Sequence, residues 1–143
     1  MTTTARFTIR DLDAFPDNEF YRYEIIDGEL YVTKAPSNEH QVICGNFHIE
    51  LGTWDRATGL GMVLLAPGVV FADDDAAIPD LVWVRKERYR GIVDSAGHFT
   101  AAPDLVIEVL SPGSENQRRD REIKLALYSR RAVTEYWIAD RET

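Results

Sequence analysis

The most apolar segment of this chain carries a carboxylate in its middle. Residues 103–112 read PDLVIEVLSP, and the carboxylate is Glu108. Because side chains of a strand point alternately to opposite faces, Glu108 shares a face with Val106 and Leu110. A carboxylate among aliphatic side chains is costly unless it is paired, hydrogen-bonded or bound to a metal ion. Two interpretations follow: either this face is solvated, as in many antiparallel sheets, or Glu108 belongs to a functional site.

A neighbouring strand offers a partner for this carboxylate. Pro-Asp pairs at 79–80 and 103–104 each begin a predicted strand. If the two strands form an antiparallel pair, the start of the first lies beside the end of the second, which places Asp80 next to Glu108. Asp104 stands at the far end, on the order of 14 Å from Glu108 and too far to share an ion. We therefore expect Asp80 to be the partner and Asp104 to be a turn or strand-entry residue.

Two carboxylates on adjacent strands suit a hard divalent cation, Mg²⁺ or Mn²⁺, because such ions prefer oxygen ligands and keep several waters. A water on that ion becomes a better nucleophile, and the ion offsets charge that grows on a phosphate oxygen. A nearby lysine would add to this stabilisation. The pattern is therefore compatible with phosphodiester hydrolysis.

The remaining segments predict an α/β (α+β) fold with a mixed, mainly antiparallel sheet flanked by helices. Asp-Gly at 27–28 indicates a hairpin. Asn38 can cap a helix that ends near 58–59, with Gln41 in a capping-box position. The apolar stripe of that helix, at spacings of four, four and three, consists of Ile43, Phe47, Leu51 and Trp54. Further strands cover 62–73, 77–87 and 133–140, and Ser114 is expected to cap the last helix.

Composition bounds the classes of protein to which the chain can belong. A length of 143 residues suits one domain, 1–143. A single cysteine, Cys44, excludes an internal disulfide, and together with the absence of a signal-like segment it favours the cytoplasm. No apolar run is long enough to cross a membrane. The net charge of −8 argues against an extended nucleic-acid surface, although arginines and a lysine gather at 118–131.

At this point the chain resembles the Uma-two family of restriction-endonuclease-like proteins. Pro79-Asp80 followed by Glu108 on the next strand resembles the PD-(D/E)XK nuclease motif. The segments that carry the wider resemblance are YEIIDGELYV, SNEHQ, PDLVWV, APDLVIEVLSP and RDREIKLALYSRRAVTEYWIAD. The resemblance implies a restriction-endonuclease-like core and metal-dependent hydrolysis of DNA.

Carried over one residue at a time, Asp80 and Glu108 match the two acids of the motif and would be its metal ligands. The lysine of the motif should stand two positions after Glu108, where this chain has Leu110. The resemblance implies that the lysine has moved to the following helix, at Lys124. Tyr128 lies one turn further on and would face the same side. The alternative for Lys124 is an ordinary solvated helix lysine.

Glu29 and His40 also match family positions and are expected to assist. Glu29 would be a further metal-site carboxylate or a salt-bridge partner of the helix lysine, and otherwise a hairpin residue facing water. His40 would contact phosphate or the metal-site water, and otherwise cap or pack its helix. Neighbouring residues expected only in supporting positions are Glu24, Glu39 and Tyr128. The acidic run at 73–75 is expected to be a solvated loop.

Three hypotheses remain at this stage. The first is a Mg²⁺- or Mn²⁺-dependent DNA endonuclease that uses Asp80, Glu108 and Lys124, with Glu29 and His40 assisting. The second, favoured by the net charge, is an inactive protein of nuclease fold that binds nucleic acid or a protein partner. An acid/base glycosidase with two carboxylates is a distant third. Family chains usually continue past the last strand, so we expect a missing C-terminal extension, an open sheet edge and a homodimer.

Overall fold

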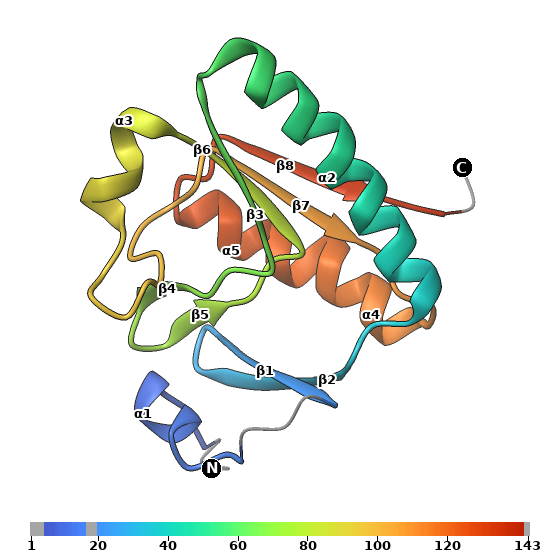
Figure 1. Cartoon of the computed structure of the whole chain (residues 1–143). Coiled ribbons are helices and arrows are strands. Elements are labelled where there is room, and N and C mark those ends of the chain that lie inside the picture. Colours follow the sequence, from blue (N-terminus) through green and yellow to red (C-terminus); the bar gives the residue numbers. More distant parts are fainter. Residues whose placement is uncertain (1–4, 17–19, 142–143) are drawn as a thin grey trace.

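The computed structural model describes residues 5–16 and 20–141 and places the strands in two four-stranded sheets (Figure 1). The first sheet has the order β2-β1-β5-β4, is antiparallel, and consists of β1 (Tyr21–Ile26), β2 (Glu29–Lys34), β4 (Val69–Ala72) and β5 (Asp75–Ala77). The second has the order β3-β6-β7-β8 and consists of β3 (Gly61–Leu65), β6 (Leu81–Arg85), β7 (Leu105–Val109) and β8 (Glu135–Ala139). In the second sheet only β8 runs parallel to its neighbour, β7. The predicted mixed, mainly antiparallel fold is confirmed, with two sheets in place of one.

Helices lie on both sides of the second sheet (Figure 1). The long helix α2 (Asn38–Thr58) covers one side, and α5 (Lys124–Arg130) covers the other. The shorter helical elements are α1 (Ile9–Leu12), α3 (Lys86–Tyr89), η1 (Arg90–Ile92), α4 (Ser114–Arg118) and the π-helical turn η2 (Arg119–Ile123). In the described part of the chain, no helix combines the length and the apolar character required to cross a bilayer.

The cap of α2 determines where its first turn begins. Ser37 is the N-cap, and its hydroxyl oxygen accepts a hydrogen bond from the His40 amide at 3.2 Å. The cap is thus one residue before the predicted Asn38. The helix ends where expected, at Gly59, whose φ of +67° is the left-handed conformation that favours glycine. This arrangement puts the His40 side chain in the first turn, facing the second sheet.

Strand β7 is buried on both faces, and its alternation separates two apolar clusters. Leu105, Ile107 and Val109 pack with the predicted stripe of α2, whereas Val106 packs with Leu127 of α5. Glu108 is on the α5 side and is only 2% exposed. The solvated-face interpretation of Glu108 is therefore excluded, and its carboxylate needs partners inside the protein.

The register of β6 and β7 places Asp80 beside Glu108. The last regular pair is Leu81 with Ile107, so Asp80, one residue earlier, is level with Glu108. Beyond that pair, carboxylate oxygens accept hydrogen bonds from the backbone amides. The Asp80 amide donates to Glu108 Oε1 at 3.1 Å, and the Val109 amide donates to Asp80 Oδ2 at 2.8 Å. The predicted proximity of the two acids is confirmed by these contacts.

The segment before α5 departs from the predicted regular helix. The N-cap is Gly113, one residue before the predicted Ser114, and the turn at Arg119–Ile123 is π-helical. In a π-helical turn the backbone hydrogen bond spans five residues and not four, so the turn is wider than in an α-helix. Such turns are frequent at functional sites. Here it brings Asp120 and Lys124 to one side, where each is 2–3% exposed.

Candidate functional site

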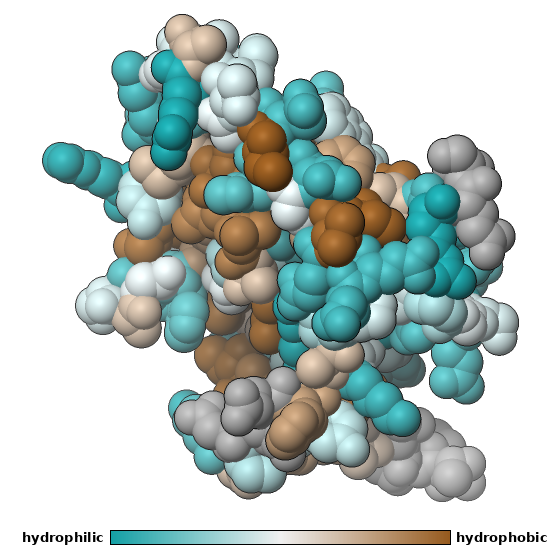
Figure 2. Space-filling model, turned by 45° about the vertical axis from the view of Figure 1, so that its right-hand side comes forward, coloured by the Kyte–Doolittle hydropathy of each residue, from teal (hydrophilic) through white to brown (hydrophobic). Residues whose placement is uncertain are grey.

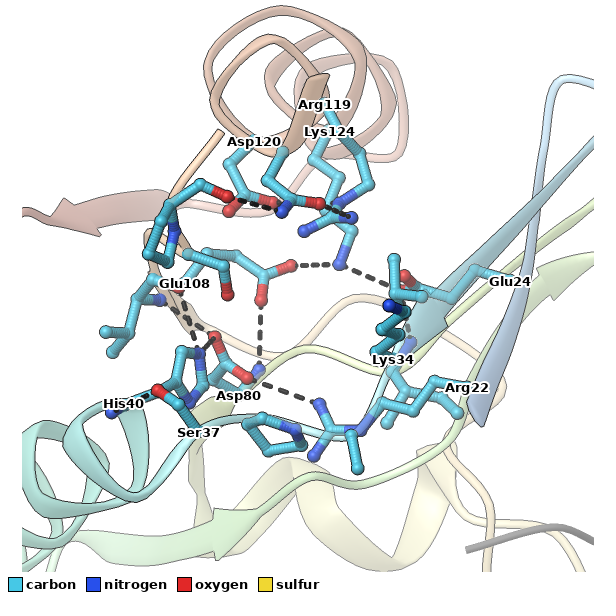
Figure 3. A pocket seen from close by; sticks show the side chains of 18 of the residues that line it. Arg22, Glu24, Lys34, Ser37, His40, Asp80, Glu108, Arg119, Asp120 and Lys124 are labelled. Atoms are coloured by element: carbon cyan, nitrogen blue, oxygen red, sulfur yellow. Dashed lines mark hydrogen bonds and ion pairs between the residues drawn. The ribbon is translucent and has the colours of Figure 1, made fainter. Parts of the chain in front are cut away.

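A cavity of about 460 Å³ lies where the two sheets, α2 and the α4–α5 segment meet. In Figure 3 the π-helical turn and α5 form its upper wall, the β1–β2 hairpin forms the right wall, and the start of α2 approaches from the lower left. The charged side chains that line it are Arg22, Glu24, Lys34, His40, Asp80, Glu108, Arg119, Asp120 and Lys124. The cavity therefore concentrates acids and bases that are far apart in the sequence.

Asp80 is held in place from three directions. Its Oδ2 accepts from the Val109 amide at 2.8 Å and lies 3.2 Å from His40 Nε2, while Oδ1 lies 3.3 Å from Arg22 Nη1. Burial acts to raise the pKa of Asp80, but the hydrogen bond and the charge of His40 outweigh burial, and the pKa is lowered. Asp80 is thus an anion, with Oδ1 facing the cavity.

Glu108 connects the sheet to α5. Its Oε1 accepts from the Asp80 amide, and its Oε2 accepts from the Lys124 ammonium and from the Tyr128 hydroxyl, the latter at 3.1 Å. Burial raises the pKa of Glu108 to about 8, although the Lys124 charge lowers it. Glu108 therefore depends on nearby positive charge to remain ionised.

Lys124 supplies that positive charge. Its Nζ lies between Glu108 and Glu24 and is 2.8 Å from Glu24 Oε2. Burial acts to lower the pKa of Lys124, but the charges of Glu108, Glu24 and Asp120 outweigh burial and raise it. The interpretation of Lys124 as a solvated helix lysine is wrong, since its side chain is 3% exposed.

His40 is a buried partner of Asp80. Its Nε2 lies 3.2 Å from Asp80 Oδ2 and 3.0 Å from the Val109 carbonyl oxygen, while Nδ1 lies 3.6 Å from Cys44 Sγ. The hydrogen bond with Asp80 is the largest cause that raises the pKa of His40 to about 10. His40 is therefore an imidazolium at neutral pH and orients the Asp80 carboxylate.

The same three side chains do not suit a common metal ion. One ligand atom each from His40, Cys44 and Asp80 lies within 4.8 Å of the others. However, Asp80 contacts Nε2 of the ring, and Cys44 contacts Nδ1. An ion bound to either ring nitrogen would face only one of the two partners. The arrangement is better described as a hydrogen-bonded chain that supports Asp80.

Oxygen atoms on the cavity side could hold a hard divalent cation. Asp80 Oδ1 has one contact, with Arg22 at 3.3 Å, and Glu108 Oε1 accepts one hydrogen bond, from the Asp80 amide. A carboxylate oxygen has two lone pairs, so each of these atoms can accept a further partner. The Val109 carbonyl oxygen is close to the Asp80 carboxylate, because both contact the same atom, His40 Nε2. Oxygen ligands of this kind are the ones that Mg²⁺ and Mn²⁺ prefer.

Four of the five predicted site residues converge, and Glu29 does not. Asp80, Glu108, Lys124 and His40 all line the cavity. Glu29 is exposed at the first position of β2, where it accepts a hydrogen bond from the Tyr31 hydroxyl at 3.0 Å.

Glu24 takes the place proposed for Glu29. It lies opposite Tyr31 in the hairpin, whereas Glu29 lies opposite Ile26, two positions nearer the turn. The two acids share a face but are separated along the strand by about 7 Å. Glu24 is 2% exposed and accepts from the Ile78 amide and from Lys124, both at 2.8 Å. Glu24 could have been found from the sequence by the same pattern as Glu108, which is an acid within an apolar strand.

Two further expectations about acids are corrected. Glu39 is exposed and forms an ion pair with Arg141, so it does not support the site. Asp75, expected in a solvated loop, is 2% exposed and accepts from the Arg130 and Arg131 side chains. Residues of the cavity that sequence reasoning did not single out are Arg22, Lys34, Arg119 and Asp120.

Comparison with known proteins identifies the family of the chain. The family model Uma2, described as "Putative restriction endonuclease", matches residues 9–143. One solved structure with a similar fold comes from Anabaena variabilis ATCC 29413 and is described as "a putative nuclease belonging to DUF820". The two superpose with a TM-score of 0.75 at 21% sequence identity, and the match covers 95% of this chain and 75% of the Anabaena chain. No curated protein matches the sequence. The structural likeness shows a shared fold, and the match of the family model over nearly the whole chain shows that this protein belongs to the Uma2 family.

Proposed function

We propose that the protein is a divalent-metal-dependent endonuclease that hydrolyses phosphodiester bonds of DNA. The observation that carries the proposal is the convergence of Asp80, Glu108 and Lys124 in one buried cluster that opens into the cavity. Membership of a family described as restriction endonucleases agrees with this assignment. Asp80 and Glu108 would hold Mg²⁺ or Mn²⁺, which would activate water and offset charge on the phosphate when bound.

The residues of the chain have separable roles in this proposal. Asp80 and Glu108 supply carboxylate oxygens, and His40 keeps Asp80 ionised and oriented. Lys124 is a permanent positive charge next to Glu108, suited to contact a non-bridging oxygen of the scissile phosphate. Glu24 and Tyr128 hold the lysine and Glu108 in position.

The second candidate is an inactive protein of the same fold that binds nucleic acid or a protein partner. The observation that favours it is the net charge of −8, which opposes association with a polyanion.

The homodimer stays a prediction; β8, an edge strand of the second sheet, is where another copy would pair.

The two candidates differ in their effect on supercoiled plasmid DNA. Purified protein is incubated with plasmid and Mg²⁺ or Mn²⁺ beside Asp80→Asn, Glu108→Gln and the matched control Asp104→Asn. Asp104 belongs to the other Pro-Asp pair and contacts Arg88, outside the cavity. We expect nicking by wild type and Asp104→Asn and at least a hundredfold loss in the other two variants. Equal nicking by all four proteins would show contamination, and plasmid binding without nicking would support the second candidate.

A further inference from the structure

We propose that the cavity accepts the sugar-phosphate backbone of a single-stranded polynucleotide, whose bases stack outside it on the β1–β2 hairpin, in preference to an intact duplex. The inference rests on the proposed function and deepens it by naming the form of the substrate. Three observations carry it: the depth of the reactive groups, the distribution of cations and the composition of the hairpin face beside the cavity.

The reactive groups lie below the protein surface. Asp80 is 8% exposed, Glu108 2% and Lys124 3%. The cavity above them is bounded by the β1–β2 hairpin and by the helical segment that carries Arg119 and Lys124 (Figure 3). A phosphate of a regular duplex is held on a wide, stiff cylinder, so bringing it into a recess costs deformation energy. A single strand can rotate about its backbone bonds and place one phosphate at the bottom.

The cations around the cavity match a short stretch of backbone. Arg22 and Lys34 come from the hairpin, and Arg119 comes from the opposite wall. Arg22 is paired with Asp80 at 3.3 Å, and Arg119 is paired with Asp120 at 3.4 Å. Among the described residues Lys34 forms no ion pair, so its ammonium is available to a phosphate. Elsewhere acids predominate, since the chain has a net charge of −8. Figure 2 shows hydrophilic and apolar side chains intermingled over the face that it draws. Contact with two or three phosphates is consistent with this distribution, whereas a duplex-binding surface requires more.

The outer face of the hairpin offers a place for bases. The register pairs Tyr21 with Lys34 and Tyr23 with Val32, so these four side chains share one face. The Tyr23 ring is stacked on Phe15 at 4.9 Å, so Tyr21 supplies the exposed ring. Lys34 and Val32 also line the cavity, which places this face at the cavity edge. Tyr21 is 42% exposed, and Val32 is 50% exposed. Such a mixture of aromatic ring, apolar surface and cation is typical of platforms for single strands, where stacking tolerates any base.

The cavity itself is unsuited to bases. No Phe, Tyr or Trp side chain is among its described lining residues, and nine of those residues carry charged or ionisable groups. A base inside would lose its stacking partners, whereas a phosphate would meet the cations that stand beside the carboxylates of the cavity. The backbone is therefore expected inside and the bases outside.

The test compares one strand with the same length of closed duplex. Fluorescence anisotropy, with Ca²⁺ as the divalent cation, measures the Kd of a labelled 20-nucleotide thymidine strand and of a DNA duplex closed by a loop. Cleavage of the two substrates is then measured with Mn²⁺ in place of Ca²⁺. Lys34→Glu is compared with Lys86→Glu, which makes the same charge change on α3, outside the cavity. Tyr21→Ala is compared with Trp137→Ala, because Trp137 is 44% exposed on β8.

We expect the single strand to bind at least tenfold more tightly than the duplex and to be cleaved faster. Lys34→Glu should weaken binding of the strand about tenfold. It should also reduce the slope of log Kd against log salt concentration by roughly 0.7, which is the value of one phosphate contact on a single strand. Tyr21→Ala should weaken it about tenfold, within the range of one lost stacking contact. Each control variant should remain within twofold of wild type.

The outcomes separate this inference from the proposed function. Cleavage of the duplex at the rate of the strand, with equal affinities, would overturn the inference and leave the endonuclease intact. Preferential binding of the strand that depends on Lys34 and Tyr21, without cleavage, would retain the binding surface and refute the activity. Equal weakening by the variants and their controls, or no preference for the strand, would refute the surface.

Discussion

The ammonium of Lys124 is shared between Glu108 of β7 and Glu24 of β1, lying 2.8 Å from Glu24 Oε2. One helix residue thus joins both sheets through a buried cluster with two acids and one base. Asp120 adds a further buried acid, whose pKa is raised by burial. Arg119 lies 3.4 Å from Asp120, and a divalent cation would add further positive charge beside these acids.

The first prediction concerns the energetic role of Lys124. Lys124→Met leaves Glu24 and Glu108 buried without their shared base, so we expect it to lower the free energy of unfolding by about 3–5 kcal/mol at pH 7. Adding Glu24→Gln should recover part of this loss, because it removes one unpaired charge. Urea denaturation of the single and double variants measures both values. Lys86→Met, at an exposed position, should change the free energy by less than about 0.5 kcal/mol. If the double variant lost the full sum of the single effects, Lys124 and Glu24 would not be coupled.

The second prediction concerns cation binding without turnover. Mn²⁺ should raise the melting temperature of the wild-type protein, because a ligand that binds only the folded state stabilises it by mass action; at 100 times Kd the gain is about 2.7 kcal/mol. Asp80→Asn should remove most of this increase, whereas Asp104→Asn should retain it. Differential scanning fluorimetry over a titration of Mn²⁺ measures the shift. A shift that persists in Asp80→Asn would place the cation elsewhere.

The third prediction concerns pH and the ion pairs of Asp75. Burial acts to raise the pKa of Asp75, but the Asp27 amide, Arg130 and Arg131 outweigh burial and lower it. Because the pKa is lower in the folded state, this carboxylate stabilises the protein fully above the unfolded value of about 3.9, and the contribution is lost as the pH falls through the folded value.

We therefore expect Asp75→Asn to cost about 2 kcal/mol at pH 7 and progressively less below pH 4. Urea titrations of both proteins at several pH values measure the difference. Asp73→Asn, at an exposed neighbouring position, should change the free energy of unfolding at pH 7 by less than about 0.5 kcal/mol. A constant difference down to the lowest pH at which the protein folds would contradict the assignment of the lowered pKa.

The fourth prediction contrasts two glycines. A Cβ at Gly61 would lie 2.1 Å from the Val84 carbonyl oxygen, whereas a Cβ at Gly45 would have no neighbour within 4 Å. Gly61→Ala should therefore destabilise the pairing of β3 with β6 by about 2–3 kcal/mol, since backbone must move. Gly45→Ala, inside α2, should stabilise the protein by about 0.5–1 kcal/mol through helix propensity. Thermal unfolding with circular dichroism distinguishes the two signs.

The parts of this fold that could be predicted are those determined by local patterns. Strand alternation placed Glu108 on the face of Val106, and antiparallel register placed Asp80 beside it; both expectations are confirmed by the contacts. The stripe of α2 and its end at Gly59 likewise follow from helical periodicity and glycine conformation. These inferences depend on only one or two elements at a time.

The parts that could not be predicted depend on how distant elements meet. Whether Glu24 or Glu29 reaches Lys124 is decided by how the hairpin is placed along α5, a shift of two residues that no local pattern encodes. Asp75 appeared to belong to an acidic surface loop because its partners, Arg130 and Arg131, lie at the end of the chain's last helix. The π-helical turn that brings Asp120 inward is likewise set by tertiary packing.

The reciprocal bonds of Asp80 and Glu108 to each other's strands have a consequence for how this protein can change over time. Each acid satisfies a main-chain amide at the point where the regular pairing of β6 and β7 stops. Selection for folding alone would therefore retain both acids, whether or not the cavity hydrolyses a phosphodiester bond.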